Sequence, residues 1–176
     1  MSAAAPIPAR PGTYALLLTV SRRQRLTVGR LGTLALQPGC YLYCGSARGP
    51  DGLRARLRHH IGSPNRPHWH IDYLHRAALP LEIWWSDAPE SNEHLWAAQC
   101  SQLPGATVPL ARFGASDCTC DAHLFFFPTP PGFPAFEQRL LPPAGQRRRI
   151  FRATDIAAAI PAVVQRQPVT SSKGTT

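Results

Sequence analysis

Residues 39–60 read GCYLYCGSARGPDGLRARLRHH, and more of the architecture follows from this segment than from any other. Its first part, Cys40–Tyr43, is apolar and rich in tyrosine, which predicts a β-strand that ends at Gly45. A turn containing glycine and proline follows. A helix is expected from Asp51, a good capping residue, to about His60. The segment therefore predicts a strand that leads through a turn into a basic helix.

The basic side chains of this helix fall on two faces. At 100° per residue, two leucines four positions apart form an apolar stripe. Arg56 and His60 flank the stripe and should lie at the edge of the core. Arg54 and Arg58 are also four apart but should turn toward solvent. We expect the first pair to serve a site and the second pair to face phosphate.

Apolar and β-branched runs bounded by turns predict further strands, and amphipathic runs predict further helices. The expected strands are Gly12–Val20, Leu26–Val28, Thr33–Gln37, Glu82–Ser86, Ala111–Phe113 and His123–Phe127. The expected helices are His68–Leu74, Ser91–Leu103 and Asp155–Ile160, the first of which also fits a strand. The segment 26–28 should return antiparallel after the turn that follows the first strand. The pattern thus mixes short strands with short helices along the chain.

A chain of 176 residues fits one domain with tails. We expect a flexible N-terminal tail over residues 1–11, a folded domain over 12–128 and a flexible Pro- and Arg-rich C-terminal extension over 129–176. The apolar runs are far below the roughly 18 residues of a membrane span, and the N-terminus lacks the core of a signal peptide. Five cysteines are a poor disulfide framework. We therefore expect a cytoplasmic protein with reduced thiols and no membrane partner.

The net charge of +9 is spread unevenly. Residues 1–76 hold 11 Arg and two acids, residues 77–138 hold one Arg and seven acids, and residues 139–176 are basic again. Codon use explains the excess of Arg over Lys but not this segregation. It predicts a nucleic-acid partner, with carboxylates in the middle segment available for a metal ion. Arginines that suit either phosphate contact or simple solubility are Arg22, Arg23, Arg25 and Arg147–Arg149.

Four features follow one another along the chain: GTY at Gly12–Tyr14, YCGSA at Tyr43–Ala47, Arg56 and His60 one helical turn apart, and a helix-borne Glu93. This order resembles the GIY-YIG nuclease superfamily. The stretches GTYALLL, GCYLYCGSARGPDGLRARLRHH, WHIDYL, EHLWA and FGASDCTCDAHLFF are similar to one subgroup in particular. Its members are small archaeal and bacterial proteins of unknown function, sometimes attached to an endonuclease III-like repair glycosylase.

The resemblance covers most of the foldable chain and implies an α+β fold, a small antiparallel β-sheet flanked by α-helices. It also implies a metal-dependent endonuclease that acts on DNA in repair or processing. It implies that Tyr14 and Tyr43 are the two superfamily tyrosines. Arg56 would be the catalytic arginine and His60 a supporting histidine. Glu93 would bind the divalent cation, Mg²⁺ or Mn²⁺. Residues expected to contact the nucleic acid are Ser46, Arg54, Arg58, His70 and Asp72.

The chemistry of these residue types fits phosphodiester hydrolysis. A guanidinium such as that of Arg56 matches phosphate oxygens, and a cation on a carboxylate acts as a Lewis acid. A tyrosine beside both could have its pKa lowered enough to accept a proton from water, and either Tyr14 or Tyr43 could fill that role. His60 could orient or shuttle a proton. The structural alternatives are an ion pair for Arg56 and helix-dipole roles for His60 and Glu93.

Two further segments carry candidate chemistry. In HWHIDY, residues 68–73, His70 and Asp72 could contact phosphate or relay protons, or could be hydrogen-bonded within a packed helix. Cys118, Cys120 and His123 offer three zinc ligands, and Cys44, Cys100 or another histidine would have to supply the fourth. The alternatives are a turn with buried cysteines or a redox-sensitive thiol pair.

Two other functions fit the same residues. One is a nucleic-acid-binding module that keeps the nuclease fold without turnover. The other is a zinc-stabilised interaction domain built on Cys118, Cys120 and His123. The sequence does not distinguish DNA from RNA, and it does not define the oligomeric state.

Overall fold

The computed structural model describes residues 6–62, 66–89, 91–140 and 150–161. Its centre is a five-stranded sheet with strand order β6-β4-β1-β5-β7, in which every neighbouring pair is antiparallel. The strands of this sheet are β1 (Gly12–Val20), β4 (Gly39–Ala47), β5 (Leu79–Ser86), β6 (Leu124–Phe127) and β7 (Phe151–Ala153). Helices pack on both faces, so the expected α+β class is confirmed.

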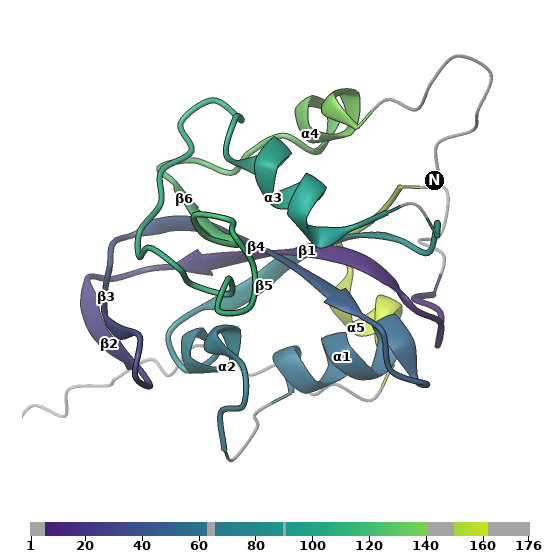
Figure 1. The fold of residues 1–176 in the computed structure, drawn as a ribbon, viewed down its shortest axis with the longest axis horizontal. Helices are drawn as coiled ribbons and strands as arrows, with labels where there is room; N and C mark the ends of the chain where they lie inside the picture. Colours follow the sequence, from purple (N-terminus) through teal and green to yellow (C-terminus); the bar gives the residue numbers. More distant parts are fainter. Residues whose placement is uncertain (1–5, 63–65, 90, 141–149, 162–176) are drawn as a thin grey trace, which may run out of the picture.

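The alternation of side chains along β1 divides the core in two. Tyr14, Leu16 and Leu18 point into one core, and Ala15 and Leu17 point into the other. Figure 1 shows the helices divided between the two faces of the sheet in the same way. The first face carries α1 (Gly52–Ile61), α2 (His70–Leu74) and α5 (Ile156–Ala159), and the second carries α3 (Glu93–Cys100) and α4 (Phe133–Arg139).

A separate hairpin, β2 (Gln24–Val28) and β3 (Gly32–Leu36), lies at one end of the sheet. The segment 26–28 does return antiparallel, but its partner is β3 and not β1. The reason is that both edges of β1 are already paired, one with β4 and one with β5.

Helix α1 begins at Gly52, one residue after the expected cap, Asp51. Asp51 occupies the N-cap position, but its side chain makes no capping hydrogen bond. Gly52 has a φ of +54°, and a Cβ there would lie 2.0 Å from the carbonyl oxygen of Arg10. The Leu53 N–H donates to the same carbonyl at 2.8 Å. A glycine is needed here because the N-terminal segment passes directly against the start of the helix.

The described parts of the expected tails are packed, because apolar side chains in them are buried. Ile7 is fully buried, and its N–H donates to the carbonyl of Ala159 at 3.4 Å. Phe136 on α4 is also fully buried, and β7 adds an edge strand beside β5. The expected Arg147–Arg149 cluster and the last 15 residues lie outside the described residues.

One expected strand is wrong. Ala111–Phe113 forms turns, and Arg112 adopts a left-handed φ of +66° that a strand does not allow. The helical reading of His68–Leu74 is confirmed by α2, and the helices expected over 91–103 and 155–160 are present in shorter form as α3 and α5. Within the described ranges, each helix is too short or too polar to cross a lipid bilayer.

Candidate functional site

Tyr14 and Tyr43 lie on the same face of the sheet, diagonal to each other across the β1–β4 pair. Their ring centroids are 6.3 Å apart. Directly opposite Tyr14 on β4 is Gly45, and a Cβ at that position would lie 2.5 Å from the Tyr14 hydroxyl oxygen. Gly45 thus leaves the space that the Tyr14 hydroxyl occupies.

Tyr14, His60 and Asp72 form a hydrogen-bonded chain that crosses from β1 to α1 to α2. Tyr14 Oη lies 2.8 Å from His60 Nε2, and His60 Nδ1 lies 2.8 Å from Asp72 Oδ1. Burial lowers the pKa of His60, although the hydrogen bond and charge of Asp72 oppose this. A neutral His60 donates from Nδ1 to the carboxylate, which leaves Nε2 to accept the Tyr14 hydroxyl proton. The three residues therefore have the order hydroxyl, imidazole, carboxylate that activates nucleophiles in hydrolases.

Asp72 is fixed by several donors besides His60. Its Oδ2 accepts the backbone N–H groups of His68 and Trp69 at 2.9 Å each, and His59 Nε2 lies 3.1 Å away. Burial alone raises the pKa of Asp72, but the hydrogen bonds from His60, Trp69 and His68 together hold it well below its ordinary value. Asp72 is thus an ionised, buried carboxylate whose orientation is set by the turn before α2.

Arg56 projects from α1 over the face of Trp69, with Cζ 4.0 Å from the ring centroid. The Trp69 ring also contacts His60 edge to face, with centroids 5.4 Å apart. Burial is the main cause of the pKa shifts, since it raises the pKa of Tyr14 and Tyr43 and lowers that of His60. The positive charge of Arg56 is a smaller cause that acts to lower all three pKa values. Arg56 is half-buried and belongs to the same cluster as the chain that Tyr14 begins.

Glu93 is the first residue of α3, and its negative charge acts on both tyrosines. After burial, Glu93 is the next largest cause that raises the pKa of Tyr43, and it also raises that of Tyr14. Both tyrosine pKa values are well above 10, with burial as the first cause. This differs from the expected lowering, because the charge of Arg56 lowers both pKa values but is too small to offset burial.

Of the residues expected to contact nucleic acid, some are accessible at the surface and others make contacts within the protein. Ser46 is half-buried beside Gly45 at the end of β4, and Arg58 is exposed on α1. Arg54 does not turn freely to solvent, because its Nε donates to the Ile7 carbonyl at 2.9 Å and it holds the N-terminal segment. His70 accepts the N–H of Gly114 at its Nδ1, 2.9 Å away, and therefore anchors a loop.

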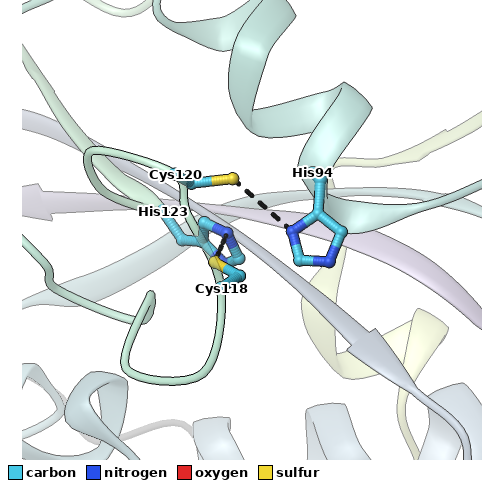
Figure 2. Close-up of side chains that lie close together, drawn as sticks. All are labelled: His94, Cys118, Cys120 and His123. Carbon is cyan, nitrogen blue, oxygen red and sulfur yellow. Dashed lines mark hydrogen bonds between the residues drawn. The ribbon is translucent and has the colours of Figure 1, made fainter.

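A second cluster contains four possible metal ligands, His94, Cys118, Cys120 and His123, whose donor atoms all lie within 4.8 Å of one another. Figure 2 shows the two thiols and two imidazoles facing a common point. Cys118 Sγ lies 3.5 Å from His123 Nε2, and Cys120 Sγ lies 3.5 Å from His94 Nδ1. The fourth residue is thus His94 at the start of α3. Cys44 and Cys100, the other residues considered as the fourth zinc ligand, do not supply it. Their sulfur atoms lie 3.4 Å apart in the second core, which contains Ala15 and Leu17.

Arg112 holds the loop that carries the two cysteines. Its guanidinium donates to the carbonyls of Cys118 and Cys120 at 2.7 and 2.8 Å, and its N–H donates to the carbonyl of Asp121 at 2.6 Å. The left-handed backbone of Arg112 directs the residue toward this loop. The His123 N–H in turn donates to the Phe113 carbonyl at 2.7 Å. The loop is therefore held in place by protein contacts alone.

A family model described as a domain of unknown function, DUF123, matches residues 13–139. The chain belongs to the DUF123 family. No curated protein and no solved structure matches it. The matched region of this DUF123 domain contains every residue of both clusters, from Tyr14 to His123.

Two residues of the DUF123 domain's clusters carry little signal in the sequence. His94 lies 24 positions before Cys118, and a single histidine in a first helical turn is not distinguished from a surface residue. Trp69 reads as core packing, yet it carries Arg56 on one side and His60 on another. The signal available in the sequence was an aromatic residue, Trp69, shortly after the basic helix that contains Arg56 and His60.

The DUF123 domain offers two sets of groups that could bind a metal ion besides Glu93: the four-ligand cluster, and His59, His60 and Asp72. The second set is already satisfied, since both oxygens of Asp72 and both ring nitrogens of His60 are hydrogen-bonded. Glu93 differs, because no salt bridge among the described residues uses its carboxylate. A half-buried carboxylate whose charge reaches two tyrosine hydroxyls fits a hard cation that also binds substrate phosphate and water.

Proposed function

We propose that this protein is a metal-dependent endonuclease of the GIY-YIG type, which hydrolyses phosphodiester bonds in nucleic acid, with DNA as the expected substrate. One observation carries the proposal: the hydrogen-bonded chain Tyr14–His60–Asp72 lies beside Arg56 through Trp69, and the charge of Glu93 reaches both tyrosines. The five groups come from four elements far apart in sequence. Phosphodiester hydrolysis needs a group that accepts a proton from water, a positive charge for the phosphate and a ligand for the cation, and these residue types can supply all three.

In the proposed reaction, Tyr14 is the general base. Its hydroxyl proton moves to His60 Nε2 as its oxygen takes a proton from the attacking water. The water oxygen bonds to phosphorus as the bond from phosphorus to the leaving sugar oxygen breaks. The leaving oxygen takes a proton from solvent, and His60 later releases its extra proton to solvent. The buried Asp72 carboxylate stabilises the imidazolium that forms and keeps His60 in the required tautomer. Tyr43 has no such partner, so the hydrogen bond from Tyr14 to His60 is the reason to choose Tyr14 over Tyr43.

Arg56 supplies positive charge to the phosphate as negative charge develops on its equatorial oxygens. Its planar guanidinium is held by the Trp69 ring, so little order is lost on binding. Preorganised donors of this kind contribute about 2.7–4 kcal/mol to lowering a barrier. Glu93 would hold a Mg²⁺ or Mn²⁺ ion, which would supply Lewis-acid charge for the leaving oxygen.

The four-ligand cluster is chemically unsuited to that cation. Two thiols and two imidazoles prefer zinc, whereas Mg²⁺ prefers oxygen ligands. We therefore assign the hard cation to Glu93 and not to the cluster.

A nucleic-acid-binding module without turnover is the second candidate. It is favoured by the burial of the tyrosines, because Tyr14 is only 1% exposed and Tyr43 only 6%. The same burial raises the pKa of both hydroxyls. Such a module would bind DNA in a salt-sensitive way and would not cleave it.

The deciding experiment is a cleavage panel over linear, nicked, flapped and branched DNA and over RNA, with Mg²⁺, Mn²⁺ or chelator. The full chain is compared with Glu93→Gln, which keeps the shape of the side chain and removes its charge. We expect cation-dependent cleavage that Glu93→Gln reduces at least a hundredfold while binding persists. Asp51→Asn is the matched control, since Asp51 is exposed and makes no capping bond.

Equal cleavage by the wild type and Glu93→Gln would identify a contaminating nuclease and reject the proposal. Binding that is lost on raising salt, with no cleavage of any substrate in either cation, would support the binding module instead.

A further inference from the structure

The distances within the four-ligand cluster match those of a zinc site. Zinc binds Cys sulfur at about 2.3 Å and His nitrogen at about 2.0–2.1 Å, almost always with tetrahedral geometry. Those bond lengths place a sulfur and a nitrogen on one zinc about 3.6 Å apart. Both sulfur–nitrogen distances in the cluster, Cys118 to His123 and Cys120 to His94, are 3.5 Å. Two of the six donor–donor distances therefore match a shared zinc ion, and all four donor atoms lie within 4.8 Å of one another.

The four ligands leave no vacant position. A catalytic zinc keeps one position for water or substrate, whereas a site with four protein ligands is structural. The other two buried thiols, Cys44 and Cys100, lie together in the second core and do not supply ligands here, whereas Cys118 and Cys120 interact with each other and could bind one metal as a pair. A structural role is therefore the one that this ligand set supports.

The cluster joins the loop of residues 118–123 to the first turn of α3. Cys118, Cys120 and His123 lie on the loop that Arg112 holds. His94 is exposed and comes from the first turn of α3, directly after Glu93. Asn92 caps this helix by accepting the Leu95 N–H at 2.8 Å, which orients the helix start but does not attach it to the loop. A metal ion would make that attachment.

We propose that His94, Cys118, Cys120 and His123 bind one structural Zn²⁺, which fixes the start of α3 and thereby positions Glu93 beside Tyr14 and Tyr43. The binding of zinc does not depend on the proposed function. The positioning of Glu93 for catalysis does rest on it.

The first test measures metal content. The untagged full chain, purified from zinc-supplemented medium, should contain about one zinc per chain by elemental analysis. Cys118→Ser and His94→Ala should lose it, and Cys100→Ala, which also removes one thiol, should retain it. Replacement by Co²⁺ should give the visible bands of a tetrahedral thiolate site in the wild type and in Cys100→Ala, and should not give them in Cys118→Ser or His94→Ala. His94→Cys preserves four ligands and should restore zinc if His94→Ala fails to fold.

A wild-type chain without zinc after reconstitution, or equal zinc loss in Cys100→Ala and Cys118→Ser, would overturn the proposed site.

The second test measures whether zinc positions the start of α3. Hydrogen exchange of the amides at residues 93–97 should become faster when zinc is removed. The Mn²⁺ concentration needed for half-maximal cleavage should rise in His94→Ala and return in His94→Cys.

The outcomes separate the two proposals. Normal zinc with no effect of Glu93→Gln on cleavage would reject the nuclease and leave the zinc site intact. Zinc removal that leaves both the exchange at residues 93–97 and the Mn²⁺ requirement unchanged would reject the positioning role.

Discussion

The hydroxyl oxygen of Tyr14, in the first strand, lies 2.8 Å from Nε2 of His60, 46 residues later in α1. Both groups are buried, and His60 is held from its other side by Asp72. A buried hydroxyl, imidazole and carboxylate in series behave as one unit, because each fixes the protonation or orientation of the next. This relationship makes the first prediction one of non-additivity.

Tyr14→Phe and His60→Gln should each reduce the cleavage rate by about 10²–10⁴, the usual range for a general base. The double variant should lose no more than the more damaging single variant, because the two residues act as a unit. Single-turnover rates with saturating enzyme measure this directly. Thermal unfolding of each variant gives the accompanying stability loss, about 1–3 kcal/mol for the buried partner that Tyr14→Phe leaves unsatisfied. Losses that multiply in the double variant would argue against a shared relay.

Gly45→Ala should disrupt the same contact from the opposite strand. A Cβ at position 45 would lie 2.5 Å from Tyr14 Oη and 2.7 Å from Cζ, and the ring cannot move away without leaving His60. We expect a destabilisation of about 1–3 kcal/mol, typical of an overpacked core, together with loss of activity. Gly49→Ala is the control, because a Cβ there meets nothing within 4 Å. Urea unfolding of both variants tests this, and equal midpoints would contradict the expected clash.

The pKa directions of His60 and Asp72 predict two steps of acid destabilisation. Burial lowers the pKa of His60 below its ordinary 6.5, so the native state binds this proton less readily than the unfolded chain. Since the unfolded state binds more protons, stability is fully present above pH 6.5 and is lost as the pH falls through the lowered value. Hydrogen bonds lower the pKa of Asp72 from its ordinary 3.8 despite burial, which adds a second loss below about pH 4.

Urea midpoints from pH 8 to pH 3 at constant ionic strength measure these steps. His60→Gln should flatten the first step, and the difference between the two curves isolates His60 from His70 and His123, whose pKa values burial also lowers. The cleavage rate should rise with pH through the same lowered value, because only neutral His60 accepts the Tyr14 proton. A wild type and a His60→Gln variant with the same pH dependence would show that His60 does not titrate as described.

The sequence predicted those parts of the fold that depend on local patterns. The strands around Tyr14 and Tyr43 and the helix that carries Arg56 follow from apolar periodicity and turn residues. Ile7 could not be assigned to the core, because one apolar residue in a Pro-rich segment has no period. Its burial depends on α5, which lies some 150 residues away in the chain.

The same limit applied to the clusters. The ordered motif identified Tyr14, Tyr43, Arg56, His60 and Glu93 through a resemblance, while Asp72 was assigned to substrate contact and not to His60. Only the packing of α2 against α1 brings its carboxylate to His60 Nδ1. His94 was left out for a similar reason, since the loop that meets it is positioned by the left-handed Arg112, and nothing in the local sequence predicts that backbone.

Arg56 should be sensitive to the shape of its side chain as well as to its charge. Arg56→Ala should reduce cleavage about 10²–10³-fold with a modest loss of DNA affinity, because its charge acts on the developing phosphate charge. Arg56→Lys should recover little of the rate, since an ammonium lacks the planar fork that lies on Trp69 at 4.0 Å. Arg30→Ala, an exposed arginine in the turn between β2 and β3, removes the same charge away from the cluster. Cleavage rates under saturating DNA, with binding measured separately in a non-cleaving cation such as Ca²⁺, distinguish the two effects. Full rescue by Arg56→Lys would show that the charge alone matters, and equal losses in Arg56→Ala and Arg30→Ala would reduce Arg56 to one more phosphate-facing arginine.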